Sequence, residues 1–216
     1  MAAGLSVSAA QFDFYKLGRT GQDFLPNGTA GTDYFVISSD NVSSSVPTTF
    51  GGSLNYTAGG ITVSAKGTYN GGTASVVQDR EGNWTEERRA GLGVYHKNPL
   101  DTSDDNITAG ETLTITFDRL VSISRIDLSS EGHNYTSWTS GSTFLLNGQE
   151  KTLPNGVGYI SNLNLVGKTF TFAYDSTGGD QFYLAALTAT AVPDGAGTVT
   201  LMGLGLLALG TVRRYL

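Results

Sequence analysis

Alternating acidic and hydroxyl residues in one short segment are the best candidates for metal chemistry in this chain. Asp101, Ser103 and Asp105 match positions 1, 3 and 5 of a calcium-binding loop, where alternate side chains can converge their oxygens on one ion. The match is incomplete, because Asn106 stands at position 6, where such loops carry glycine. The pattern leaves two alternatives, a calcium ion bound in a loop or a solvated acidic turn without a ligand.

A second group of residues could contact carbohydrate through aromatic rings. Trp138 lies in the polar stretch 134–139, where a core tryptophan is less expected. Together with Trp84, Tyr135 and His133, it could form a surface that packs against the apolar faces of sugar rings. The alternative is that these aromatic side chains belong to the core, as most aromatic side chains do.

Residues for nucleophilic or acid–base catalysis are hard to assemble from this sequence. There are two histidines, His96 and His133, and no serine lies in a Gly-x-Ser-x-Gly elbow. The sequence around His133 is typical of a turn, which predicts a solvated histidine. Glu86 and Glu87 do not by themselves meet the geometry of glycoside hydrolysis, because adjacent strand residues point to opposite faces. We therefore predict no enzymatic activity and no catalytic residues.

The C-terminal segment has three parts in a clear order. Residues 192–195 interrupt regular structure, because proline fixes φ and glycine frees the chain. Residues 196–212 follow without a charged side chain, and Arg213 and Arg214 come directly after them. This order predicts a C-terminal hydrophobic helix that spans a membrane marginally, with the arginines as a basic stop on the cytoplasmic side.

This tail resembles the PEP-CTERM sorting tails of exported bacterial proteins, most closely the variant with the short motif Val-Pro-Asp. The resemblance covers residues 192–214. It implies that exosortase, a membrane cysteine transpeptidase, recognises Val192, Pro193 and Asp194 and cleaves near them. The protein would then be anchored in the membrane by its tail and, after processing, lie at the cell surface or outside the cell. An ordinary C-terminal anchor helix is the alternative.

The N-terminal residues resemble the end of a secretion signal. Residues 1–10 are small and mostly apolar and end in Ser8, Ala9 and Ala10, which suits the small residues that signal peptidase accepts. We interpret them as a signal-peptide remnant whose start lies upstream, with a disordered N-terminus as the alternative. The predicted ectodomain then covers residues 11–191, and the sorting tail covers residues 192–216.

Alternating hydrophobic residues recur throughout the predicted ectodomain. In residues 112–117 leucine, isoleucine and phenylalanine alternate with threonine, which predicts a strand with one buried face. Residues 121–128 change parity midway, which predicts a bulge or bend. Turn signals such as Asn147-Gly148 separate the strands. We predict an all-β fold, a two-sheet antiparallel β-sandwich of the jelly-roll-like kind, followed by the C-terminal hydrophobic helix.

Composition narrows the classes of function. The chain has 216 residues, a formal net charge of −6 and no cysteine. A negative surface without a basic patch excludes nucleic acid as a partner, and the lack of cysteine excludes disulfide scaffolds and thiolate metal sites. We predict an exported structural or binding module of the cell surface, in an exopolysaccharide or biofilm matrix, with exosortase and polysaccharide as partners. The alternative is an extracellular carbohydrate-active hydrolase.

Overall fold

The structure is a computed structural model, and every regular element in the part that it describes is a β-strand. The named strands all pair antiparallel, which confirms the predicted all-β class. No helix among the described residues has the length and hydrophobicity that crossing a membrane would require. The predicted C-terminal helix falls on residues after Pro193, outside the described part. The described residues are 8–17, 23–28, 35–38, 42–43, 51–79, 90–96 and 105–193.

The strands are short at the start of the chain and long towards its end. Within the described ranges they are β1 (Ala9–Phe12), β2 (Phe35–Ile37), β3 (Val42–Ser43), β4 (Leu54–Ala58), β5 (Ile61–Tyr69), β6 (Gly72–Asp79), β7 (Leu92–Tyr95), β8 (Glu111–Ser130), β9 (Thr143–Leu146), β10 (Gln149–Thr152), β11 (Tyr159–Tyr174) and β12 (Phe182–Ala191).

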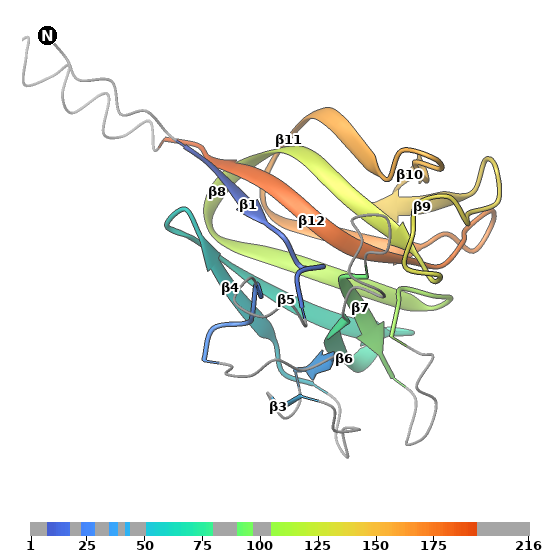
Figure 1. Cartoon of the computed structure of the whole chain (residues 1–216), viewed down its shortest axis with the longest axis horizontal. Helices are drawn as coiled ribbons and strands as arrows, with labels where there is room; N and C mark the ends of the chain where they lie inside the picture. The colour runs from blue at the N-terminus through green and yellow to red at the C-terminus, as the bar shows by residue number, and fades with distance from the viewer. Residues whose placement is uncertain are drawn as a thin grey trace, which may run out of the picture.

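The long strand β8 connects two groups of strands. One of its edges pairs with β11 over most of its length, whereas the other pairs first with β5 and then, from Val121 onward, with β12. In Figure 1, β4, β5 and β6 lie below β1, β11 and β12, and β8 passes between the two groups. All of these strands therefore belong to one hydrogen-bonded sheet, and the prediction of two separate sheets is not confirmed.

A single large core cluster is filled from both groups of strands. Leu113, Ile115 and Phe117 of β8 are buried, and the threonines between them face outward, as the alternation predicts. The ring of Phe117 lies 5.9 Å from the ring of Phe12 in β1 and 5.9 Å from that of Phe170 in β11. Edge-to-face aromatic contacts of this kind favour one packing arrangement. The core thus fixes β1 and β11 against β8.

Two bulges change the direction of side chains in neighbouring strands. In β8 the buried positions change parity between Ile123 and Ile126, and Ser124 is the extra residue relative to β12. In β12, Ala185 is an extra residue relative to β8. The first bulge confirms the parity change predicted from the sequence. Because β-bulges re-aim the residues that follow them, Arg125 leaves the face to which Ile123 belongs.

The described ends of the chain lie side by side. β1 pairs antiparallel with β12, so that Ala9 faces Thr190 and Ala10 faces Ala189 (Figure 1). Ala10 is buried, and the predicted boundary after residue 10 falls inside this strand. β12 ends at Ala191, directly before the predicted sorting motif, and the N–H of Val192 donates to the carbonyl oxygen of Leu120 at 2.9 Å.

Candidate functional site

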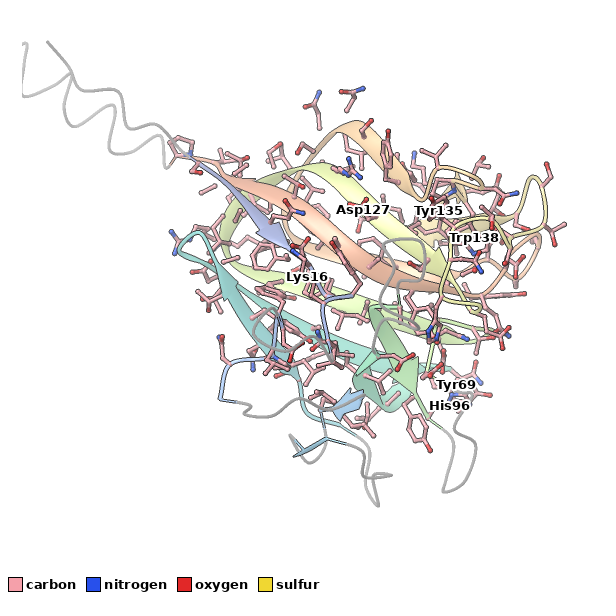
Figure 2. The ribbon with its side chains drawn as sticks, in the orientation of Figure 1. Lys16, Tyr69, His96, Asp127, Tyr135 and Trp138 are labelled. Atoms are coloured by element: carbon pink, nitrogen blue, oxygen red, sulfur yellow. The ribbon has the colours of Figure 1, made fainter. Side chains whose placement is uncertain are left out.

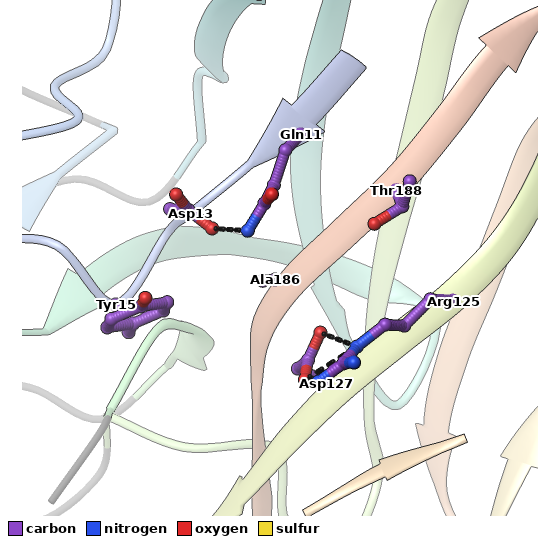
Figure 3. A pocket seen from close by; sticks show the side chains of 7 residues that line it. All are labelled: Gln11, Asp13, Tyr15, Arg125, Asp127, Ala186 and Thr188. Atoms are coloured by element: carbon purple, nitrogen blue, oxygen red, sulfur yellow. Dashed lines mark hydrogen bonds and ion pairs between the residues drawn. The ribbon is translucent and has the colours of Figure 1, made fainter. Parts of the chain in front are cut away.

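A polar hollow of about 340 Å³ lies on the outer face where β1, β12 and β8 run side by side (Figure 3). Strand register builds it: Gln11 of β1 faces Thr188 of β12, and Thr188 faces Arg125 of β8. Three polar side chains therefore stand in one row across three strands. The full lining is Gln11, Asp13, Tyr15, Arg125, Asp127, Ala186 and Thr188.

The Arg125 side chain is held in place from two sides. Its Nε donates to both carboxylate oxygens of Asp127 at 3.1 and 3.0 Å, and its Nη2 donates to Oδ1 at 2.6 Å. Its Cζ lies 3.9 Å from the centre of the Tyr159 ring, within the range of a cation–π contact. The hydrogen bonds that Arg125 donates to the Asp127 carboxylate raise the pKa of Arg125. The result is a planar, charged group whose orientation is set before any ligand arrives.

The opposite wall of the hollow carries a second carboxylate. Asp13 accepts a hydrogen bond from Gln11 Nε2 at 2.7 Å and forms an ion pair with Lys16 Nζ at 2.5 Å. Figure 3 shows the amide of Gln11 turned towards Asp13. The N–H of Tyr15 donates to the carbonyl oxygen of Ala185, the extra residue of the β12 bulge, at 3.1 Å. The bulge therefore fixes the backbone that carries Asp13 and Tyr15 beside the hollow.

A smaller hollow of about 140 Å³ shares Arg125 and Asp127 with the first. Its remaining lining is more apolar and aromatic, and consists of Leu128, Tyr135, Val157, Gly158 and Tyr159. Gly158 has φ +78°, and a Cβ added there would lie 2.8 Å from Cβ of Tyr135. Because the glycine allows this close approach, Tyr135 can pack directly against the backbone and line the hollow.

The predicted carbohydrate-contact residues have different positions. Tyr135 is half-buried and lines the smaller hollow. Trp138 is only 3% exposed, and its Nε1 donates to the carbonyl oxygen of Gln181 at 2.9 Å. The indole of Trp138 is therefore a core side chain, which corrects its predicted role on a sugar-stacking surface. Trp84 lies outside the described residues. Figure 2 shows Tyr135 and Trp138 with Asp127.

The predicted calcium loop is described only at its end. Asp105 accepts a hydrogen bond from the Tyr183 hydroxyl at 2.5 Å, whereas Asp101 and Ser103 lie outside the described residues. Within the described ranges, no three histidine or acidic side chains are arranged to hold a metal ion. The calcium hypothesis stays a prediction. Of the predicted sorting residues, Val192 and Pro193 are described, whereas Asp194, Arg213 and Arg214 are not.

Asp105 belongs to a cluster of titratable groups that the sequence did not indicate. His133 Nε2 lies 3.0 Å from Asp79 Oδ2 and 3.5 Å from the Tyr183 hydroxyl. Burial and the nearby charge of Asp79 raise the pKa of Asp105 to about 6, and burial raises that of Tyr183 well above its ordinary value. His133 lies in a turn with a partly exposed side chain, as its sequence predicts, but it also contacts Asp79 and Tyr183, which the prediction of a solvated histidine did not include. Nothing in the sequence predicts the contact of His133 with Asp79, which lies at the end of the distant strand β6.

A second histidine contact lies elsewhere on the molecule. The His96 ring stacks on Tyr69 with 3.5 Å between ring centres, and its Nδ1 lies 2.6 Å from Oε1 of the buried Glu111. Figure 2 shows Tyr69 and His96 away from Asp127 and Tyr135. This contact joins three parts of the chain: Tyr69 belongs to β5, His96 follows β7, and Glu111 begins β8. None of the three residues lines either hollow.

Comparison with protein-family models returned no match, and neither did comparison with curated proteins or with solved structures. The function must therefore be inferred from the site itself. Apart from Tyr135, the sequence did not single out any residue of the two hollows as functional. The signal that could have found them is the parity change in residues 121–128, because bulges often lie next to binding sites.

Proposed function

We propose that this protein is an exported surface or matrix module, a jelly-roll-like β-sandwich that binds polysaccharide at the Arg125 hollow. The observation that carries the proposal is the row of Gln11, Thr188 and Arg125 across three paired strands, beside the carboxylates of Asp13 and Asp127. Strands hold such a row rigidly, so its donors and acceptors are pre-organised. Pre-organisation reduces the entropic cost of binding.

The chemistry of the hollow suits a ligand rich in hydroxyl groups. A hydroxyl both donates and accepts hydrogen bonds. Asp13 and Asp127 supply acceptors, Arg125 supplies donors, and the Gln11 amide and the Thr188 hydroxyl supply both. The geometry favours binding over hydrolysis. An acid for glycoside hydrolysis must carry a proton, whereas Asp127 accepts hydrogen bonds from a permanently charged guanidinium.

Export and sorting rest on the C-terminal tail. Its resemblance to PEP-CTERM tails implies anchoring in the membrane, recognition by exosortase, and release to the cell surface or the extracellular matrix. The end of β12 is compatible with this role, because Pro193 is exposed and follows the last strand with only Val192 between them. The motif therefore begins directly after the last described strand.

Binding of the full chain, in detergent, to an array of neutral and uronate-containing polysaccharides tests the ligand proposal. We expect binding by the wild type and at least a tenfold loss in Arg125→Ala, since 1.4 kcal/mol corresponds to about tenfold. Arg119→Ala is the matched control, because Arg119 also pairs with an aspartate on β8, Asp118, but lines neither hollow. Equal binding by wild type and Arg125→Ala would contradict the proposal, and release of shortened sugar chains would favour the hydrolase.

A further inference from the structure

We propose that the two hollows are adjacent subsites for one neutral polysaccharide chain, which crosses the strands from β1 towards β11 and passes over Arg125. This inference rests on the proposed function and specifies its ligand. The starting point is that the hollows of about 340 and 140 Å³ share Arg125 and Asp127 in their lining. A ligand that fills both must contact this pair at its middle.

The combined site is longer than one sugar ring. The first hollow includes Gln11 of β1, and the second includes Tyr159 of β11. In this part of the sheet the strand order is β1, β12, β8 and β11, so three strand spacings separate the two ends. At about 4.8 Å per spacing, the span is roughly 14 Å. A chain of several units covers that distance, whereas a monosaccharide occupies one hollow alone.

The two hollows also differ in the chemistry of their linings, so that each could bind a successive unit of one chain in a different way. The first is lined mainly by polar groups that hydrogen-bond hydroxyls, among them Gln11 and Asp13. The second presents the Tyr135 and Tyr159 side chains and the exposed Val157. Aromatic and aliphatic surfaces of this kind pack against the apolar face of a sugar ring. One unit would be bound through its hydroxyls and the next through its ring face.

Charge disfavours a polyanionic chain. The lining of the two hollows contains two carboxylates, Asp13 and Asp127, and each has a cationic partner, Lys16 for Asp13 and Arg125 for Asp127. Arg125 already donates to both oxygens of Asp127, so its charge is compensated within the protein. The chain as a whole carries a net charge of −6. A uronate unit would therefore meet repulsion without an uncompensated cation beside it, and the structure assigns a neutral chain.

Two variants and a length series test this assignment. Dextran and laminarin serve as neutral polysaccharides, alginate and polygalacturonate as anionic ones, and size-fractionated oligomers of one to six units from each as the length series. Calorimetry with the full chain should show affinity that rises from one unit to several for a neutral series. Tyr135→Ala should weaken the longer oligomers about tenfold and leave the single unit unchanged, because Tyr135 lines only the second hollow, whereas Tyr159 also holds Arg125. Val166→Ala is the control, because Val166 lies on β11, is exposed and lines neither hollow.

Each outcome separates the inference from the proposed function. Equal affinity for one and six units, or tighter binding of alginate than of the neutral chains, would overturn the inference while leaving a carbohydrate-binding protein. An unchanged length dependence in Tyr135→Ala, with the thermal transition intact, would also overturn it. If no polysaccharide of either class binds, the proposed function fails, and the inference fails with it.

Discussion

At the scale of single residues, the protein contains two arginine–aspartate pairs on the same strand in different surroundings. Asp127 is 7% exposed and lies beside the hollows, whereas the Asp118–Arg119 pair is exposed to solvent. We expect Asp127→Ala to lower the free energy of unfolding by about 2 kcal/mol, because it removes hydrogen bonds to a charged group. Asp118→Ala should cost less than about 1 kcal/mol. Urea unfolding of both variants measures the difference, and equal costs would show that Asp127 is not a structural anchor for Arg125.

The cluster around Asp105 predicts a dependence of stability on pH. Its pKa is about 6 in the folded protein, against an ordinary value of 3.8, so between these values the folded state binds more protons than the unfolded state. The stabilising contribution is complete below pH 3.8 and is lost as pH rises through about 6. Relative to Asp105→Asn, we expect the wild type to lose about 1–3 kcal/mol between pH 4 and 7. Parallel stability curves for the two proteins would contradict this assignment.

At the scale of elements, the sequence predicted the bulge of β8 but not its consequence. The parity change of residues 121–128 lies within one strand and can be read locally. The hollow also needs Gln11 and Thr188, which reach Arg125 through strand pairing between distant parts of the chain. Trp138 shows the same limit. Its polar neighbours suggest exposure, whereas its actual partner is the carbonyl of Gln181, the residue directly before β12.

The bulge in β12 depends on a close contact with Gly91. A Cβ at Gly91 would lie 2.4 Å from the carbonyl oxygen of Leu184 and 2.7 Å from Cα of Ala185, and its φ is +146°. We expect Gly91→Ala to lower the free energy of unfolding by about 2–4 kcal/mol, through strain and displaced backbone. Gly60→Ala is the control for positive φ alone, because Gly60 has φ +74° and no atom within 4 Å of an added Cβ. Thermal unfolding compares them, and equal losses would contradict a steric role for Gly91.

At the scale of the whole molecule, hydrophobic alternation was enough to predict an all-β chain but not its connection into one sheet. The buried face of strands such as β5 and the first half of β8 can be read from the alternation of their own residues. The route of β8 cannot be read in this way, because its first half pairs with β5 and its second half with β12 on the same edge. Phe117, the last residue of β8 that pairs with β5, contacts Phe12 and Phe170, which are far from it in sequence. The sorting tail stays a prediction, since most of it lies outside the described residues.

Processing of the predicted tail should depend on how accessible the sorting motif is to exosortase. The mature protein from its natural host should lack the residues after about Pro193. The hydrogen bond from Val192 to the Leu120 carbonyl holds the start of the motif against β8. We expect a four-residue glycine–serine insertion between Ala191 and Val192 to accelerate cleavage severalfold, measured by intact mass over time. The same insertion in the Asn147–Gly148 turn is the control. A tail that stays attached in the wild type would contradict sorting by exosortase.

The pairing of β12 with β8 also has a mechanical consequence. The predicted tail follows β12 at Val192, and Thr188, in the row of the proposed binding site, lies near the end of that strand. A pull between an anchored tail and a bound polymer would thus enter and leave the molecule near one corner. The load would pass along the end of β12 and across to Arg125 of β8, in shear with the antiparallel pairing of the two strands. The core around Phe117 and the strands β4 to β7 would lie outside this path, so a tethered module could bear tension without being stretched open.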